Sequence, residues 1–179
     1  MEASICYRGH LPDKSRVQQL IAEVCDIART MQWPHACMDE DWHQPPSARL
    51  DSSSESGIHI TGHCGLKGVW FRPHEHCEPV WLYFNAAGTL TSPFQLALDA
   101  EEGYPARAPW IAIKTQTAGM DTHIRIVGLL RYLQGTYQLD LSVYDESGYW
   151  ATGDAEALAR YFQQATPGTE TNKDAVIEQ

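Results

Sequence analysis

The segment 62–84 reads Gly-His-Cys-Gly-Leu-Lys-Gly-Val-Trp-Phe-Arg-Pro-His-Glu-His-Cys-Glu-Pro-Val-Trp-Leu-Tyr-Phe. Two apolar and aromatic runs, at 66–71 and 80–84, enclose a polar segment that contains two prolines, a pattern typical of neighbouring antiparallel strands. A third run, at 58–61, alternates apolar and polar residues just before them. The three runs predict an antiparallel meander at the centre of the chain.

A long amphipathic helix is predicted before this meander. Apolar residues recur at three- and four-residue steps from Val17 to Met31, with polar residues on the opposite face. Ser15 is expected to cap this helix, with Gln18 reaching back as in a capping box, and Pro34 to end it. We expect strands on both sides of the helix, at 5–8 and 35–38.

The second half of the chain repeats this pattern. Strands are predicted at 110–114 and 139–144, and the long helix between them is entered at Asp121 or Thr122 and ends near Tyr137. A short helix is expected at 92–98, a short strand at 149–151, and a last helix capped by Asp154.

These elements predict a single α+β domain over residues 1–165. Its central sheet is expected to be antiparallel or mixed, with the two long helices and the C-terminal helix packed on one face. Two β-α-β units, at 5–42 and 110–150, could flank the meander, although they share too few identities to indicate a duplication. Residues 43–57 are rich in Pro, Ser, Asp and Glu and predict an exposed loop, and residues 166–179 predict a polar, disordered tail.

Charge and composition exclude several classes of partner. The 179 residues carry a formal net charge of -10, with a sequence pI near 5.1, which argues against binding to nucleic acid or to an anionic membrane. No run approaches the roughly 20 apolar residues of a membrane-spanning helix, and the first residues do not resemble a signal peptide. The five cysteines are irregularly spaced, so we expect reduced thiols and a cytoplasmic location.

The candidate metal ligands lie in the central segment. His63, His74, His76 and Cys77 could bind zinc or iron if adjacent hairpin ends bring them together. Their spacing lacks the paired Cys-x2-Cys or His-x3-5-His signature of structural zinc sites. The alternative is that the histidines lie in an exposed turn. Whether any cofactor is bound is left open.

Two catalytic hypotheses use other combinations of residues. Cys77 could act as a thiol nucleophile with His63 or His74 as its base, since adjacent residues of a strand point to opposite faces. Asp145 and Glu146, with Asp154, could supply an acid and a base near Lys114 if their strands are neighbours, although carboxylates are common in turns.

Aromatic residues provide the candidate binding surface. Trp70, Trp81 and Tyr83 occur on two predicted neighbouring strands, and alternation must send some aromatic side chains to each face of the sheet. One face could then be open to a protein partner or a small ligand, with Lys114 beside it. The alternative is that both faces are covered.

Four segments resemble a family of uncharacterised bacterial proteins: Gly-His-Cys-Gly-Leu-Lys-Gly, Pro-His-Glu-His-Cys-Glu-Pro-Val-Trp, Lys-Thr-Gln-Thr-Ala-Gly and Tyr-Asp-Glu-Ser-Gly-Tyr-Trp-Ala-Thr-Gly-Asp. The resemblance implies a bacterial, intracellular origin and brings no activity, cofactor or catalytic residue with it. The function predicted from the residues is therefore a non-catalytic binding module that acts through the central sheet. A metal-dependent hydrolase that uses the His and Cys cluster is the alternative.

Overall fold

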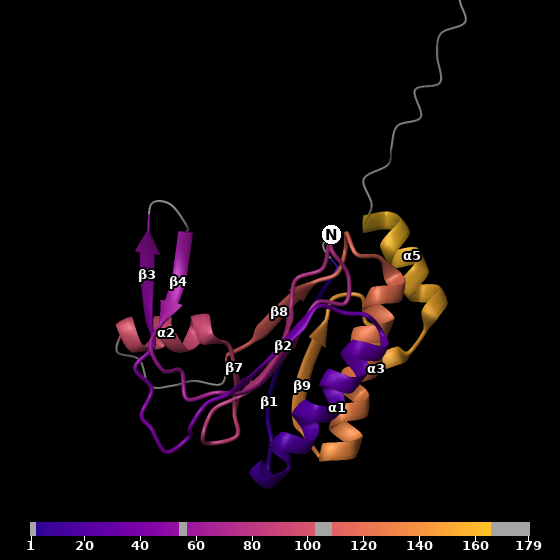
Figure 1. Cartoon of the computed structure of the whole chain (residues 1–179). Helices are drawn as coiled ribbons and strands as arrows, with labels where there is room; N and C mark the ends of the chain where they lie inside the picture. Colours follow the sequence, from indigo (N-terminus) through magenta and orange to yellow (C-terminus); the bar gives the residue numbers. More distant parts are fainter. Residues whose placement is uncertain (1–2, 54–56, 103–108, 166–179) are drawn as a thin grey trace, which may run out of the picture.

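The computed structural model describes residues 3–53, 57–102 and 109–165 and shows a mixed α+β fold with antiparallel strand pairing (Figure 1). The strands are β1 (Ser4–His10), β2 (His35–Asp39), β3 (Arg49–Ser53), β4 (Gly57–Thr61), β5 (Lys67–Phe71), β6 (Val80–Phe84), β7 (Leu90–Thr91), β8 (Ile111–Lys114) and β9 (Asp140–Asp145). The helices are α1 (Val17–Thr30), α2 (Pro93–Glu102), α3 (Met120–Tyr137), α4 (Tyr149–Thr152) and α5 (Ala155–Ala165), and a 3-10 turn at Lys14–Arg16 precedes α1.

The strands form two main sheets that meet beside β1. One sheet has the order β8-β1-β9 and the other β2-β5-β6-β7, while β3 and β4 form a separate hairpin. A single antiparallel bridge between His10 and Thr89 joins β1 to the turn before β7. β8 pairs with residues 4–7 of β1, whereas the bridge to Thr89 lies at His10, so the two sheets meet at the His10 end of β1.

Both long helices connect strands that are not neighbours. β8 and β9 both run antiparallel to β1, so α3 joins two parallel strands with β1 between them. In the same way α1 joins β1 to β2, which lie in different sheets. β8, α3 and β9 therefore form a split β-α-β unit, whereas β1, α1 and β2 do not lie in one sheet.

One apolar core lies beneath both sheets. The apolar faces of α1 and α3 pack against it, because Val17, Leu20 and Val24 on α1 meet the same cluster as Ile126 and Leu130 on α3. Strand alternation supplies the other side of the core. Its strand residues are Ile5, Tyr7, Val69, Phe71, Val80, Leu82, Phe84, Leu90, Ile111, Ile113 and Leu141.

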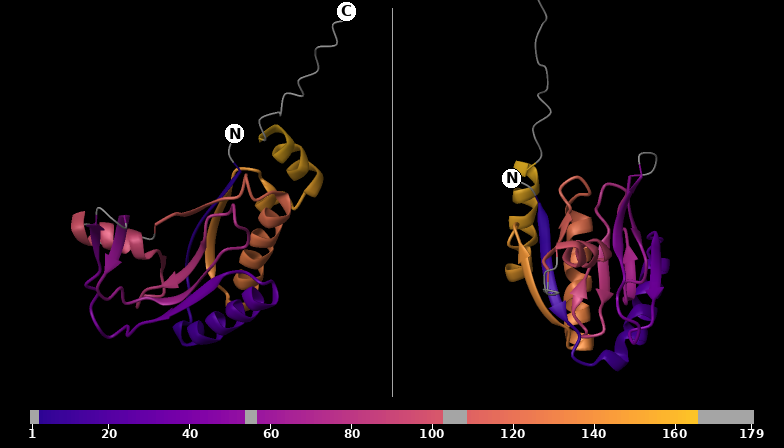
Figure 2. Two further views of the ribbon diagram at one scale, coloured as in Figure 1. Left: turned by 45° about the horizontal axis from the view of Figure 1, so that its top comes forward. Right: turned by 90° about the vertical axis from the view of Figure 1, so that its left-hand side faces the viewer.

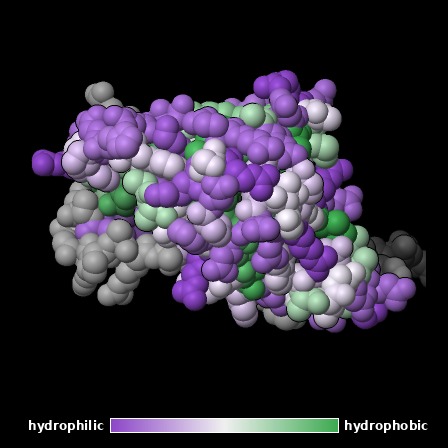
Figure 3. Space-filling model, turned by 90° about the horizontal axis from the view of Figure 1, so that it is seen from below, coloured by the Kyte–Doolittle hydropathy of each residue, from purple (hydrophilic) through white to green (hydrophobic). Residues whose placement is uncertain are grey.

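The opposite side of the sheets is covered at one end only. The β3–β4 hairpin and α2 lie together over the β5–β6 end, away from α1, α3 and α5 (Figures 1 and 2). Over β8-β1-β9 the outward side chains stay exposed, as Arg8, Lys114 and Tyr144 are. Seen from below, the surface is mostly hydrophilic, and its hydrophobic residues are scattered (Figure 3).

Three local predictions differ from the structure. Within 43–57, the segment predicted as a loop, Arg49–Ser53 form β3, because pairing with β4 allows Leu50 and Ile60 to pack against the cluster beneath α2. β4 pairs with β3 and not with β5, so the meander is limited to β5 and β6 with their neighbours. Residues 149–151 form part of α4 and not a strand.

The helix caps are partly as predicted. The N-cap before α1 is made by Asp13, whose Oδ1 accepts the Ser15 N–H at 3.1 Å, and Gln18 instead donates to Asp39. Asp154 caps α5 by accepting the N–H groups of Glu156 and Ala157. A carboxylate thus caps the 3-10 turn, while α1 itself, whose N-cap residue is Arg16, has no side-chain cap.

Two further points concern the whole described chain. None of its helices combines the length and the apolar character needed to cross a membrane. The five cysteines are free thiols. The predicted tail at 166–179 lies outside the described residues.

Candidate functional site

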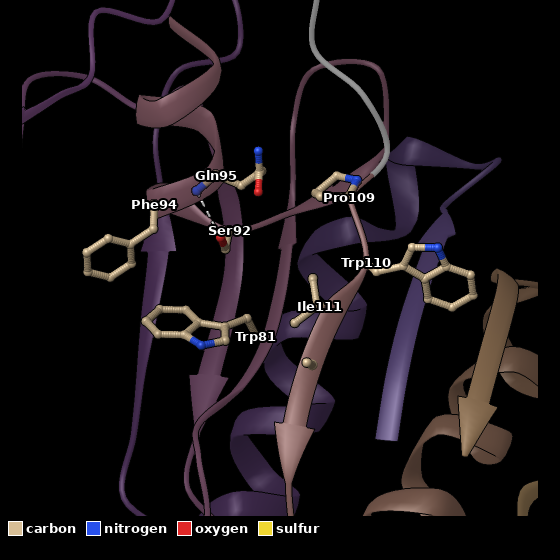
Figure 4. A pocket seen from close by; sticks show the side chains of 8 residues that line it. Trp81, Ser92, Phe94, Gln95, Pro109, Trp110 and Ile111 are labelled. Atoms are coloured by element: carbon tan, nitrogen blue, oxygen red, sulfur yellow. Dashed lines mark hydrogen bonds between the residues drawn. The ribbon is translucent and has the colours of Figure 1, made fainter. Parts of the chain in front are cut away.

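A pocket lies where the two sheets separate, between β6 and β8. It has a volume of about 180 Å³ and combines apolar and polar groups from three segments of the chain. In Figure 4 Trp81 and Phe94 lie on one side and Pro109 and Trp110 on the other, and the indole of Trp110 extends away from the first pair. The residues that line it are Trp81, Ser92, Phe94, Gln95, Pro109, Trp110, Ile111 and Ala112.

A single hydroxyl bridges the two sheets in the core beside this pocket. Tyr7 is fully buried, and its hydroxyl donates to the Trp81 carbonyl at 2.7 Å and accepts the Trp81 N–H at 3.0 Å. These are the backbone groups that a neighbouring strand would otherwise pair with. Burial raises the pKa of Tyr7, so the hydroxyl keeps its proton. The Tyr7 hydroxyl therefore satisfies the edge of β6 at Trp81.

The other end of β8 is held by the loop before β6. The Lys114 N–H donates to the Glu78 carboxylate at 3.0 Å, and the Cys77 thiol lies 3.7 Å from the Lys114 carbonyl. Backbone groups alternate along a strand, so the N–H and C=O of Ala112 also face away from β1, toward the pocket. No partner for these two groups is seen among the described residues. The pocket thus offers one backbone donor and one acceptor.

Much of the apolar rim of the pocket is open to solvent. Phe94 is 44% exposed and Trp110 is 48% exposed, while Leu98, one helical turn after Phe94, is 40% exposed. The Arg8 guanidinium lies 4.6 Å from the centroid of the Trp110 ring, a cation–π contact on the open face of β1. Exposed apolar side chains are therefore concentrated beside the pocket.

The predicted aromatic surface is largely covered. Trp70 and Trp81 are half-buried with ring centroids 6.3 Å apart, and Tyr83 is 3% exposed. Tyr83 packs with Ala97 of α2 in the cluster beneath α2 and the hairpin. Lys114 lies on the open face of the other sheet. Of the four predicted binding residues, Trp81 alone lines the pocket.

The four predicted metal ligands are not brought together. His63 follows β4, where its Nε2 lies 2.9 Å from the Asp41 carbonyl, near the Lys67 end of β5. His74 and His76 lie beyond the opposite end of β5, with ring centroids 5.5 Å apart. In the part of the chain that the structure describes, no group of three or more His, Cys, Asp or Glu residues is arranged to hold a metal ion.

The thiol of Cys77 lies in an unfavourable environment for a nucleophile. Its side chain is buried, and burial raises its pKa to about 11. The neighbouring His76 is exposed and lies 3.5 Å from the Glu75 carboxylate. The structure gives Cys77 no described base to activate it.

A buried polar cluster, which the sequence interpretation missed, lies under α5. His123 is fully buried; its Nδ1 lies 2.8 Å from the Thr115 hydroxyl, and its Nε2 lies 3.3 Å from Asp145 Oδ2 and 3.2 Å from Ser147 Oγ. Tyr149 and Phe162 pack their ring edges against the imidazole. Ser, His and Asp therefore meet here.

This cluster is not arranged as a catalytic triad. Ser147 and Asp145 both lie at Nε2, whereas a triad needs them at opposite ring nitrogens. Ser147 also donates to Asp145 at 2.7 Å, and Trp150 N–H donates to the other carboxylate oxygen. Burial alone would raise the pKa of Asp145, but its hydrogen bonds with His123, Ser147 and Trp150 lower the pKa to about 2. The cluster stabilises the fold.

The strand order also bears on the predicted carboxylate site near Lys114. Asp145 pairs with Ile5 and Lys114 pairs with Ser4, so the two residues lie on opposite sides of β1. Asp154 caps α5 and takes no part in the cluster. The only sequence signals for the buried pair were a histidine inside an apolar helix and an aspartate at a strand end.

Comparisons place the chain beside no known protein. No family model matches it, and neither a curated protein nor a solved structure matches it significantly. The resemblance of the four segments to a bacterial family remains an expectation. The proposed function therefore rests on the geometry of the site.

Proposed function

We propose that the chain is a non-catalytic binding module whose partner is a basic protein segment. The segment inserts one large apolar side chain into the pocket between β6 and β8. The observation that carries the proposal is the pocket itself, which is lined by Trp81 and Phe94 and lies beside the exposed Trp110.

The size of the pocket supports a side chain over a free cofactor. Pockets for small organic ligands usually measure roughly 300–1,000 Å³. At about 180 Å³ this pocket suits a single ring or branched aliphatic group. Anchors of this kind supply much of the affinity of protein interfaces.

The surroundings of the pocket support an extended partner. Ala112, which lines the pocket, is exposed on the outward face of β8, so an extended segment has room there. The unpaired backbone groups of Ala112 offer a donor and an acceptor to the main chain of an incoming segment. The net charge of -10 would speed encounter with a basic partner.

The experiment uses short synthetic peptides and the full chain. Each peptide carries one Trp, Phe or Leu flanked by Lys and Arg, and a matched series has Glu in the flanks. Fluorescence anisotropy should show saturable binding to the basic series, weakened about tenfold or more by Phe94→Ala, a loss of about 1.4 kcal/mol.

Tyr144→Ala is the matched control, because Tyr144 is 60% exposed but lies on β9 outside the pocket. Its affinity for the peptides should equal that of the unaltered chain. Equal binding by Phe94→Ala, or no preference between basic and acidic flanks, would contradict the proposal.

A metal-dependent hydrolase is the weaker proposal, supported only by the proximity of His74 and His76. Its test is the metal content of untagged protein and of a His74→Ala, Cys77→Ala double variant. We expect no stoichiometric zinc or iron in either protein. Near-stoichiometric metal that the double variant loses would favour the hydrolase.

A further inference from the structure

A second hollow lies at the C-terminal end of α1, away from the pocket described above. It is formed by the end of α1, the loop after β5 and one residue of α3, and has a volume of about 540 Å³. It shares no residue with the pocket between β6 and β8. Its lining residues are Met31, Gln32, Trp33, Pro34, Arg72, Pro73, His74, Glu75 and Arg125.

Two arginines at this hollow have unused side chains. Arg72 and Arg125 are both exposed, and neither guanidinium has a hydrogen bond or an ion pair with any described residue. Some of the other described arginines are engaged, as Arg29 is with Asp26 and Arg131 with the Trp150 carbonyl. A chain of net charge -10 thus keeps two free guanidinium groups beside one hollow.

His74 adds a third donor. Its Nδ1 accepts the backbone N–H of His76 at 3.1 Å, so the neutral ring carries its proton on Nε2. No acceptor for this Nε2–H occurs among the described residues. The hollow therefore gathers three donor groups from two elements.

The acceptors around the hollow are the Glu75 carboxylate and the last carbonyls of α1. The Glu75 carboxylate lies 3.5 Å from His76 Nε2. The last carbonyls of α1 accept the N–H groups of Met31, Gln32 and Trp33, which fold the chain back at the helix end. The negative end of the helix dipole is thus largely satisfied.

We propose that this hollow binds a small organic anion through phosphate or carboxylate oxygens. A guanidinium matches two oxygens of either group in one plane, and two such groups can share an anion that carries more than one negative charge. His74 Nε2–H would donate to a third oxygen. The side chain of Trp33, stacked on Phe71 at 5.4 Å, gives the hollow a rigid floor.

The charge of the whole chain limits the class of ligand. A large acidic macromolecule would be repelled by the net charge of -10 over its extended contact area. A small anion experiences chiefly the local arginines, because salt screens charges more than about 8–10 Å away. A small molecule is therefore favoured over nucleic acid or an acidic protein.

The test titrates the full chain with pyrophosphate and, separately, with citrate, using calorimetry and amide NMR shifts. We expect saturable binding of at least one probe at or below about 1 mM, and the tighter probe identifies phosphate or carboxylate as the preferred group. The largest shifts should fall at Arg72, His74 and Arg125. An Arg72→Gln, Arg125→Gln double variant should weaken this binding about tenfold or more.

Arg160→Gln is the matched control, because Arg160 is exposed on α5 and does not line the hollow. Its affinity should equal that of the unaltered chain. Thermal unfolding of the double variant should be unchanged, since both arginines are exposed. Absence of saturable binding by both probes, or equal weakening by Arg160→Gln, would overturn the proposal.

This result is independent of the peptide experiment. Phe94→Ala leaves the hollow untouched and should bind pyrophosphate and citrate as the unaltered chain does. Loss of anion binding in Phe94→Ala would also count against a separate site.

Discussion

The two flanks of the β8-β1-β9 sheet differ in how they are closed. Beside the ends of β1 and β9, α5 seals a dense polar cluster around His123 and Asp145, whose side chains are 0% and 1% exposed. On the β6 side, the hydroxyl of Tyr7 and the carboxylate of Glu78 span the gap, and a pocket remains. The titratable His123 and Asp145, which resemble part of a catalytic site, are thus inaccessible to solvent. The accessible pocket is lined mainly by apolar side chains.

The comparison also distinguishes stability from binding. A buried carboxylate is costly to remove, because the donors that it accepts from are left without a partner. An exposed aromatic residue at a pocket rim stabilises the fold little and remains available to a partner. The two flanks should therefore respond in opposite ways to substitution.

The largest effect is expected from Asp145→Ala. Removing the carboxylate leaves His123 and the Trp150 N–H without their acceptor in a sealed site. We expect a loss of about 3–5 kcal/mol in the free energy of unfolding. Urea unfolding at neutral pH measures it. Asp140→Ala, which removes an exposed carboxylate of the same strand, should change it by less than about 0.5 kcal/mol.

The same carboxylate makes the stability depend on pH. Its pKa in the folded chain is about 2, below the ordinary value of 3.8, so its stabilisation is complete above about pH 4 and is lost as the pH falls toward 2. Asp145→Ala should lose this part of the acid dependence. A variant whose stability falls as steeply as that of the unaltered chain between pH 4 and 2 would show that the carboxylate is not the cause.

An intermediate effect is expected from Tyr7→Phe. The change keeps the ring in the core but leaves the N–H and C=O of Trp81 without their partner. We expect a loss of about 1–3 kcal/mol in the free energy of unfolding, measured by chemical denaturation. Tyr144→Phe, on an exposed neighbour of β1, is the control and should be nearly neutral. Equal stability of both variants would mean that the hydroxyl does not hold the sheets together.

The smallest effect is expected from Phe94→Ala, which should change stability by less than about 0.5 kcal/mol because the ring is 44% exposed. Phe162→Ala provides the contrast from the sealed flank. Its ring packs against His123 and is 9% exposed, so its loss should cost about 3–5 kcal/mol. Thermal or urea unfolding of the two variants compares the flanks directly, and similar losses would remove the distinction.

Much of the secondary structure could be predicted from local periodicity. The apolar repeats from Val17 onward and before Tyr137 give α1 and α3, and the alternation at 139–144 gives β9. β3 was not predicted, because Arg-Leu-Asp-Ser-Ser has a single apolar residue and its strand conformation depends on pairing with β4. Such pairing is a property of the tertiary structure and leaves little local signal.

The candidate site was predicted poorly for a related reason. His123 and Asp145 are 22 residues apart and meet only because α3 and β9 pack at the same end of β1. Trp81 was identified as a candidate, but Phe94 was not, since a lone phenylalanine in a short helix gives no indication that a neighbouring strand will leave a gap. Positions of cavities follow from sheet separation, which sequence spacing does not encode.

The central position of β1 has a consequence for how the chain folds during synthesis. Its partners are β8 and β9, so the backbone of Ile5 can be paired on both sides only after residues 113 and 145 have been synthesised. At ribosomal rates of about 5–20 residues per second, β1 remains unpaired on the order of ten seconds after it emerges. Contacts so distant in sequence also slow the search for the native arrangement. β1 is made well before its partners and is thus among the last described strands to be fully paired, so translation speed should influence the yield of folded protein.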